Sequence, residues 1–376
     1  MTITERGPRA LPDFPWDTLA PYAATARRHP DGVVDLSVGT PVDPTPVVVQ
    51  EALRQAADAP GYPATYGTPA LREAVAGWFA RRRGVPDVDP DGVLPTIGSK
   101  ELVAWLPTLL GLGPGDVVVH PQVAYPTYDV GARLAGATPL PADGTAQVGP
   151  GTRDVRLVWL NSPGNPTGRV LGREHLAKVV AWARGIGAVV ASDECYAELG
   201  WESDDVPSLL DPQVTGGSSE GLLAVYSLSK QSNLAGYRAA FVAGDPVLVR
   251  RLLEVRKHAG LIVPWPVQAA LTAALADDVH VAEQKARYRA RRDVARAALE
   301  GAGFRIDHSE AGLYLWATLD EPCWDTVGRL AAAGVLVAPG AFYGAAGARH
   351  VRVALTATDE RIGALAERLQ SASLPA

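Results

Sequence analysis

The sequence predicts an α/β fold, in which helices cover both faces of a large, mostly parallel sheet, together with a smaller α+β domain. Two observations carry this prediction. Over residues 117–243, short apolar runs alternate with helix-like segments, which is typical of a parallel sheet buried on both faces. After Gly303 the pattern changes to short strands with helices between them, which indicates a second, smaller unit.

The elements of the large sheet follow from the spacing of apolar residues. A proline-rich break at 41–46 precedes the first helix pattern. Helices are expected at residues 47–59, 71–83, 102–110, 127–135 and 173–186. Strands are expected at residues 117–120, 155–160, 188–192, 222–226 and 239–243.

The rest of the chain is expected to form the smaller domain. One long helix is predicted over residues 267–299, and the Arg and Lys residues of its second half indicate one solvated face. The first forty-odd residues, rich in Pro and Gly, are expected to form an extended arm that packs with this domain. Short strands are expected at 313–317, 335–338 and 351–355, with helices at 324–333 and 359–370. We therefore expect an arm at 1–45, a large domain at 46–270 and a small domain at 271–376.

Composition excludes several classes of function. The apolar share of 47% and charged share of 20% are typical of a globular protein with a large core. A net charge of −6 gives no general attraction to nucleic acid or to an anionic membrane. The sequence has no apolar run long enough to span a bilayer and no signal-peptide core, so a cytoplasmic location is expected. The two cysteines form no CxxC and no histidines form HExxH, so no metal site is expected.

Lysine is scarce in this chain, and Lys230 stands out. It lies in the segment SLSKQSNLAGYR at 227–238, between two predicted strands, where a solvated charge is unusual. Lysine amines form Schiff bases with carbonyl compounds, among them pyridoxal phosphate. The nearby serines and Arg238 suit a phosphate group. The alternative is an ordinary surface loop.

Three segments follow predicted strands, where parallel sheets bind their ligands. NSPGNPTG at 161–168 is either a tight loop or a rigid turn that holds Asn165 as a donor. SDECY at 192–196 offers Asp193 or Glu194 as a partner for a ring nitrogen, and spacing alone does not separate them. Asp193 could instead cap a helix, and Tyr196 could bond a phenolic oxygen. PQVAYPTY at 121–128 supplies tyrosines that could stack on a flat ring or pack in the core.

Two further positions suggest anion binding. GSKE at 98–101 opens a helix-like run, whose first N–H groups suit a phosphate, although Ser99 could be only a cap. Arg352 lies in the late strand VRVAL among apolar neighbours. A partly buried arginine suggests a carboxylate partner, either a substrate or a structural ion pair.

Taken in order, these segments resemble the fold-type I pyridoxal-phosphate aminotransferases, the aspartate aminotransferase superfamily. The family shows the same succession: LSVGTP, a YP…ALREA segment, GSKE, YPTY, NSPGNPTG, SDECY, SLSK with an arginine eight positions later, and VRVAL. The motifs span Gly39 to Arg352, most of the chain, and their order is far more specific than any one of them. The resemblance implies pyridoxal phosphate as the cofactor and a large sheet of the seven-stranded type.

The resemblance also implies a role for each residue near the cofactor ring. Lys230 matches the Schiff-base lysine, which also moves the proton between Cα and C4′. Asp193 matches the acid that pairs with the pyridine nitrogen. Asn165 and Tyr196 match the residues that hold the 3-oxygen, and Tyr125 matches the aromatic side chain stacked on the ring. The implied catalytic residues are Lys230, Asp193 and Tyr196.

The remaining matches concern the phosphate and the substrate. Tyr62 matches a tyrosine that reaches the phosphate of a neighbouring subunit, which implies a homodimer. Arg352 matches the arginine that binds the substrate α-carboxylate, with Gly39 and Asn165 beside it. The other residues implied at the phosphate are Ser99, Lys100, Ser227 and Arg238.

The segments GSKELV, LSKQSNLAGYRAAFVAGD and IVPWPVQAA are most similar to those of actinobacterial N-succinyldiaminopimelate aminotransferases. These enzymes use glutamate and 2-oxoglutarate in lysine and cell-wall synthesis. The implied reaction is a ping-pong transfer of an amino group from an amino acid to a 2-oxo acid. The alternatives are an aminotransferase for aspartate, alanine or aromatic amino acids, a C–S lyase on the same scaffold, and a non-catalytic regulator that binds the cofactor.

Overall fold

A computed structural model describes residues 11–149 and 154–372, so the first ten residues of the predicted arm lie outside the described residues. Its larger sheet has seven strands in the order β2-β8-β7-β6-β5-β3-β4. Only β8 runs against its neighbours, β2 and β7, and the other pairs are parallel. The predicted sheet is therefore confirmed. Its strands are β2 (Val93–Ile97), β3 (Val117–His120), β4 (Thr138–Pro141), β5 (Val155–Asn161), β6 (Val189–Asp193), β7 (Leu222–Ser227) and β8 (Ala239–Gly244).

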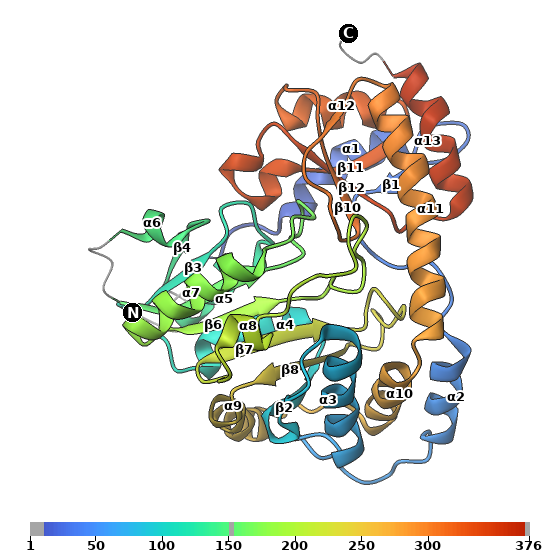
Figure 1. Cartoon of the computed structure of the whole chain (residues 1–376). Coiled ribbons are helices and arrows are strands. Elements are labelled where there is room, and N and C mark those ends of the chain that lie inside the picture. The colour runs from blue at the N-terminus through green and yellow to red at the C-terminus, as the bar shows by residue number, and fades with distance from the viewer. Residues whose placement is uncertain (1–10, 150–153, 373–376) are drawn as a thin grey trace, which may run out of the picture.

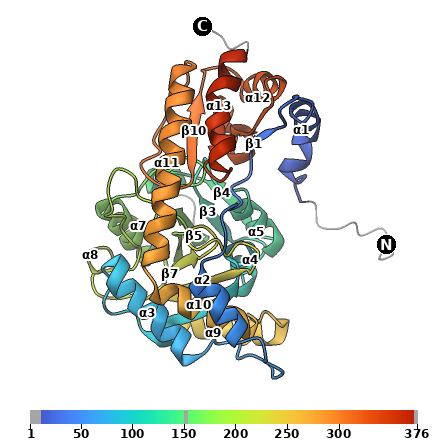
Figure 2. The same ribbon diagram turned by 90° about the vertical axis from the view of Figure 1, so that its right-hand side faces the viewer.

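Helices cover both faces of this sheet, and Figure 2 shows α7 and α5 on opposite sides of it. One core joins the sheet to α3 (Pro69–Arg83), α7 (Arg173–Ile186) and α10 (Trp265–Ala276). The other joins it to α4 (Ser99–Leu109), α5 (Thr127–Ala135) and α9 (Pro246–Ala259). Strand β5 contributes side chains to both cores, because alternate side chains of a strand point to opposite faces. Val158 and Leu160 enter the first core, and Leu157 and Trp159 the second.

A second sheet has five strands in the order β1-β11-β12-β10-β9. Strand β1, from the N-terminal part of the chain, pairs in parallel with β11, while the other pairs are antiparallel. Strand pairing thus joins the N-terminal part of the chain to the C-terminal part. The elements of this unit are α1 (Ala20–Ala26), β1 (Val34–Leu36), β9 (Arg305–Ile306), β10 (Tyr314–Thr318), α12 (Cys323–Ala332), β11 (Val335–Pro339), β12 (Val351–Ala354) and α13 (Asp359–Ser371).

The predicted long helix at 267–299 is wrong, because the chain breaks between α10 and α11 (Val279–Gly301). Asp277 has an extended backbone, and its carboxylate accepts a hydrogen bond of 2.8 Å from the N–H of Val279. A side chain that satisfies a free N–H in this way starts a new helix. Helix α11 then runs from the large sheet to the second sheet (Figure 1).

The prediction of an arm that is extended throughout is wrong, because the arm contains a 3₁₀ turn (Pro15–Leu19) followed by α1. Pro15 and Pro21 occupy first-turn positions of these two elements, where no N–H is required. Leu19, Ala23 and Ala26 pack into the core of the second sheet. We keep the limits 1–45, 46–270 and 271–376 as a proposal for the domain boundaries. The remaining elements are α2 (Val47–Gln55), α6 (Thr145–Val148), α8 (Pro212–Thr215) and three short 3₁₀ turns at Pro90–Gly92, Gly340–Tyr343 and Ala345–Gly347.

Candidate active site

Four neighbouring strands of the large sheet bring candidate residues to one edge. Strands β7, β6, β5 and β3 run parallel and lie side by side. The segments that leave their carboxyl ends carry, in that order, Lys230, Asp193, Asn165 and Tyr125. Parallel strands end at the same edge, so positions that are scattered in the sequence converge there.

These residues line a cavity of about 700 Å³ between the large sheet and the second sheet. Tyr62 does not reach it and is 100% exposed on the outside of the chain. The cavity collects the other predicted site residues: Gly39, Ser99, Lys100, Tyr125, Asn165, Asp193, Tyr196, Ser227, Lys230, Arg238 and Arg352.

Lys230 lies in the turn between β7 and β8, with its amine in this cavity. The amine donates a hydrogen bond to the carbonyl oxygen of Gly39. Burial lowers the pKa of Lys230, and the positive charges of Arg352 and Arg238 act in the same direction. A lysine with a lowered pKa releases its proton more readily, which suits an amine that reacts with a carbonyl.

Asp193 ends β6 and is buried. Its carboxylate accepts hydrogen bonds from the Tyr128 hydroxyl at 3.0 Å and from the Cys195 N–H at 3.2 Å. It caps a turn and not a helix, so the helix-cap alternative is not observed. Burial raises the pKa of Asp193 and outweighs the hydrogen bonds from Cys195 and Tyr128, which lower it. A cationic partner in the cavity would favour the ionised form.

Glu194, the rival acid, faces away from the cavity. Its carboxylate pairs with the buried guanidinium of Arg83 at 3.4 Å and accepts the N–H of Leu209 at 2.7 Å. Because successive side chains at a strand end point to opposite faces, only one of the two acids can face the cavity. The structure places Asp193 there and uses Glu194 within the fold.

Arg352 is 3% exposed and projects from β12 of the second sheet. Its Nη1 donates to Asn165 Oδ1 at 3.1 Å and its Nη2 to the Ser37 carbonyl at 2.7 Å, while its Nε has no partner among the described residues. No carboxylate of the described residues pairs with it, and the groups that raise its pKa against burial are tyrosines, led by Tyr343. The predicted alternative of a structural ion pair is therefore not observed.

Arg238 and the start of α4 lie against each other and form part of the cavity wall. A Cβ on Gly98 would lie 2.1 Å from Arg238 Nη2, and Gly98 has a φ of +76°. Only glycine allows the guanidinium to lie against this turn. Ser99 begins α4, and the Ser227 hydroxyl donates to Ser229 Oγ at 2.8 Å. N–H groups at a helix start, hydroxyls and a guanidinium together suit a phosphate.

Sequence reasoning missed several residues that line the cavity, notably Tyr314, Trp16 and Phe14. Tyr314 lies in β10, and its hydroxyl is 3.1 Å from that of Tyr196. A tyrosine within an apolar strand is the one signal that could have indicated it. Trp16 and Phe14 come from the N-terminal part, whose position depends on long-range packing.

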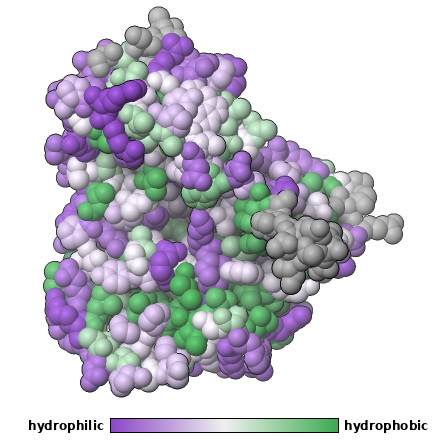
Figure 3. Space-filling view, turned by 180° about the vertical axis from the view of Figure 1, so that it is seen from behind, coloured by the Kyte–Doolittle hydropathy of each residue, from purple (hydrophilic) through white to green (hydrophobic). Residues whose placement is uncertain are grey.

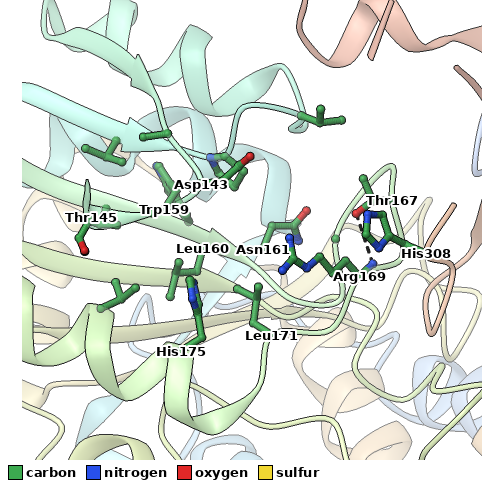
Figure 4. Close-up of a pocket in the computed structure, with 18 of the residues that line it drawn as sticks. Asp143, Thr145, Trp159, Leu160, Asn161, Thr167, Arg169, Leu171, His175 and His308 are labelled. Carbon is green, nitrogen blue, oxygen red and sulfur yellow. Dashed lines mark hydrogen bonds between the residues drawn. The ribbon is translucent and has the colours of Figure 1, made fainter. Parts of the chain in front are cut away.

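A second cavity, of about 250 Å³, lies on the other side of the 161–168 loop. Figure 4 shows Leu160, Leu171 and His175 along its wall, with Arg169 and His308 near the loop. It is lined by part of that loop, including Asn161 and Thr167, but by none of the predicted site residues. The candidate chemistry therefore belongs to the larger cavity.

Comparison with known proteins decides the family. The sequence model of the family "Aminotransferase class I and II" matches residues 31–369. The chain belongs to the class I and II aminotransferases. It is 62% identical, over 96% of its length and 99% of the relative's, to the 4-dedimethylamino-4-oxo-anhydrotetracycline transaminase OxyQ of Streptomyces rimosus.

Two further relatives of this aminotransferase agree. A protein of Mycobacterium tuberculosis, named a probable aminotransferase, is 61% identical over 96% of this chain and 85% of that protein. The structure of a probable N-succinyldiaminopimelate aminotransferase from Thermus thermophilus is 30% identical, with a TM-score of 0.86 over 95% of this chain and all of that one. Within the described residues, no helix has the length and apolarity needed to cross a membrane.

Enzymes of this aminotransferase family depend on pyridoxal phosphate, and the cavity fits that cofactor. It contains a lysine whose pKa is lowered, which suits a reaction with the aldehyde of the cofactor. It also contains a buried carboxyl group, which suits a pairing with the ring nitrogen. Arg238 and the first turn of α4 lie together in its wall, where they suit a phosphate. The prediction of an aminotransferase that uses pyridoxal phosphate is confirmed.

Proposed function

We propose that this aminotransferase moves the amino group of an amino acid to a 2-oxo acid by a ping-pong sequence, with N-succinyl-LL-diaminopimelate and 2-oxoglutarate as the pair. The observation that carries the reaction type is Arg352. A buried guanidinium without an acid partner among the described residues lines the same cavity as the amine of Lys230. The carboxylate of a ligand would pair with this guanidinium and so place the ligand's α-carbon near the lysine.

We assign the cofactor contacts to residues of the cavity. Lys230 would hold the aldehyde carbon and Asp193 the ring nitrogen. Asn165 and Tyr196 would bind the 3-oxygen, and Tyr125 would lie on the ring. The phosphate would be held by Ser99, Lys100, Ser227 and Arg238, with Tyr62 from a second subunit. When bound, the cofactor carries the amino group and withdraws electrons from the Cα–H bond.

The chain's own residues would then handle the substrate and the proton. Arg352, with Gly39 and Asn165 beside it, would fix the α-carboxylate and so the direction of the Cα–H bond. Lys230 Nζ would remove the Cα proton and return it one carbon away, for which a lowered pKa is favourable. Asp193 would stay ionised against a protonated ring nitrogen, since an opposite charge lowers a carboxyl pKa.

The choice of N-succinyl-LL-diaminopimelate is supported by the similarity of sequence segments and by the Thermus thermophilus structure, whose name mentions this activity. This substrate would place the protein in lysine biosynthesis, and we propose a cytoplasmic location. A second candidate is favoured by a higher identity. The 62% identical relative is named for a 4-oxo-anhydrotetracycline, so a polycyclic ketone is the alternative acceptor.

The test is a panel of substrates with the purified holoenzyme. Each amino donor is paired with 2-oxoglutarate, and the glutamate formed is measured. N-succinyl-LL-diaminopimelate should exceed aspartate, alanine and aromatic amino acids in kcat/KM by at least about tenfold, the ratio that 1.4 kcal/mol of binding gives. A second series pairs glutamate with a 4-oxo-anhydrotetracycline. Turnover in that series alone would contradict the proposed substrate pair, while the assignment as an aminotransferase would stand.

We further propose a homodimer in which Tyr62 reaches the site of the other subunit. The fully exposed phenol and exposed apolar residues such as Val47, Trp105 and Trp265 support a subunit contact. Seen from behind, apolar residues gather on the lower half of the molecule (Figure 3). In mixed dimers of Tyr62→Ala and Lys230→Ala chains, one site regains both residues. Pyridoxal phosphate affinity that is lost in Tyr62→Ala should return in the mixture, and no recovery would contradict the shared site.

A further inference from the structure

Tyr314 lines the cavity, although no sequence motif points to it. It is 4% exposed and comes from β10 of the second sheet, whereas most of the other candidates come from the large sheet. Its hydroxyl lies 3.1 Å from the Tyr196 hydroxyl, and the two rings meet edge to face at 5.7 Å. Tyr314 therefore contacts the residue assigned to the cofactor's 3-oxygen.

The ring of Tyr314 also supports the arginine assigned to the substrate. The guanidinium carbon of Arg352 lies 4.0 Å from the ring centre, within the range of a cation–π contact. This contact follows from the register, because Arg352 pairs with Trp316 and Tyr314 lies two residues along on the same face of β10. The Nε of Arg352 lacks a hydrogen-bond partner among the described residues, and the Tyr314 ring is the nearest of three aromatic rings around the guanidinium carbon.

A third contact joins Tyr314 to the lysine side of the cavity. A Cβ on Gly39 would lie 2.2 Å from the Tyr314 hydroxyl oxygen, so this hydroxyl requires glycine at position 39. The carbonyl of Gly39 in turn accepts the Lys230 amine. Tyr314 thus contacts Tyr196, which is assigned to the cofactor oxygen, and Arg352, which is assigned to the substrate carboxylate. It also lies against Gly39, whose carbonyl accepts the hydrogen bond of the lysine.

We propose that Tyr314 is a positioning residue that links the cofactor side of the site to the substrate carboxylate side. Its hydroxyl donates to Tyr196, whose own proton is then directed to the 3-oxygen, and its ring holds the Arg352 guanidinium in place. This inference rests on the proposed function of Tyr196 and Arg352. It predicts that the hydroxyl and the ring have separable effects.

Tyr314→Phe removes the hydroxyl and keeps the ring. Tyr196 then becomes a weaker donor, and an oxygen anion with a weaker donor holds a proton more tightly. The pH midpoint at which the visible absorbance of the bound cofactor changes should rise by about half a unit to one unit, as expected for one hydrogen bond. kcat should fall roughly 3- to 10-fold, with the KM for the amino donor little changed.

Tyr343→Phe is the matched control. The Tyr343 ring also lies near Arg352, at 5.1 Å, but its buried hydroxyl has no hydrogen-bond partner among the described residues. This variant loses a hydroxyl beside the same arginine without changing Tyr196, and it should leave the absorbance midpoint where it is. Tyr314→Leu removes the ring as well, and it should weaken calorimetric binding of succinate, a dicarboxylate that cannot react, by about tenfold compared with Tyr314→Phe.

The outcomes separate the inference from the proposed function. If Tyr314→Phe and Tyr343→Phe titrate like the wild type, the positioning role of the Tyr314 hydroxyl is wrong, even where transamination proceeds. If Tyr314→Leu binds succinate as Tyr314→Phe does, the support of Arg352 by the ring is wrong. If wild-type protein neither transaminates nor binds succinate, the proposed function itself has failed. Thermal unfolding of each variant checks that it is folded.

Discussion

Arg352 and Asn165 lie on different sheets and are joined by a hydrogen bond of 3.1 Å, from Nη1 to Oδ1. Arg352 belongs to β12 of the second sheet, and Asn165 follows β5 of the large sheet. The bond therefore fixes the proposed carboxylate site relative to the proposed cofactor site. This bond also depends on the planar, forked shape of the guanidinium, which a lysine side chain lacks.

We expect Arg352→Lys to raise the KM for α-carboxylate donors and to lower kcat/KM by about 10- to 100-fold. An ammonium group cannot bond Asn165, the Ser37 carbonyl and a carboxylate in the planar geometry that a guanidinium allows. Steady-state kinetics with the best donor of the panel measures the effect. The cofactor's absorbance should be unchanged, and an unchanged KM would contradict the assignment of Arg352.

Asp193→Asn and Glu194→Gln form a matched pair of neighbouring substitutions. Asp193→Asn removes the only cavity-facing acid of the pair, and we expect a loss of kcat on the order of 100-fold or more with little change in stability. Glu194→Gln weakens a buried pair with Arg83 and should reduce the free energy of unfolding by about 3 kcal/mol. Turnover per folded molecule should persist in Glu194→Gln. Urea unfolding and kinetics on both variants distinguish the two roles, and the reverse pattern would exchange them.

Gly98→Ala should weaken the binding of pyridoxal phosphate by about 10- to 100-fold. The added Cβ would meet Arg238 Nη2 at 2.1 Å and displace a charged donor from the proposed phosphate site. Gly84→Ala is the control, since Gly84 also has a positive φ, +66°, but nothing lies within 4 Å of its Cβ. Gly84→Ala should lose about 1 to 2 kcal/mol of stability, because Gly84 has a left-handed backbone. Gly98→Ala should lose about 1 to 3 kcal/mol, because its ψ of 154° at positive φ is essentially restricted to glycine. Equal cofactor affinities in calorimetry would rule out the phosphate site at Arg238.

Lys230→Met should abolish transamination and stabilise the cofactor-free protein by about 1 kcal/mol. Burial lowers the pKa of Lys230 below its ordinary value of 10.5. The unfolded chain therefore binds more protons between the two pKa values, and wild-type stability rises with pH in that window. At pH values below the folded-state pKa, Lys230 is charged in both states, and the buried charge lowers the free energy of unfolding by its full amount. Urea unfolding from neutral pH to pH 10 should show a smaller rise for the variant, and parallel curves would contradict the buried charge.

The sequence could predict much of the fold because strands, helices and loops depend largely on local spacing. Helices at 127–135 and 173–186 match α5 and α7 in full. Some of the missed elements have a weak or masked local signal, although α9 was missed despite an Asp245 cap, a first-turn proline and a C-terminal glycine. Strand β4 (Thr138–Pro141) contains two prolines and is largely open to solvent, and α1 begins among prolines. The break at Asp277 depended on one side-chain cap within an otherwise continuous apolar pattern.

By itself, the sequence identified segments that line the candidate cavity, since motifs such as SLSK and NSPGNPTG each begin at the end of a strand. Only the tertiary structure decided which side chains meet. Spacing could not separate Asp193 from Glu194, because adjacent residues at a strand end point to opposite faces and the packing of α3 determines which face is which. The contacts of Arg352 with Asn165 and Tyr314 depend on the approach of two sheets and on the register of β10 and β12. These distances arise from long-range packing, which no local pattern in the sequence encodes.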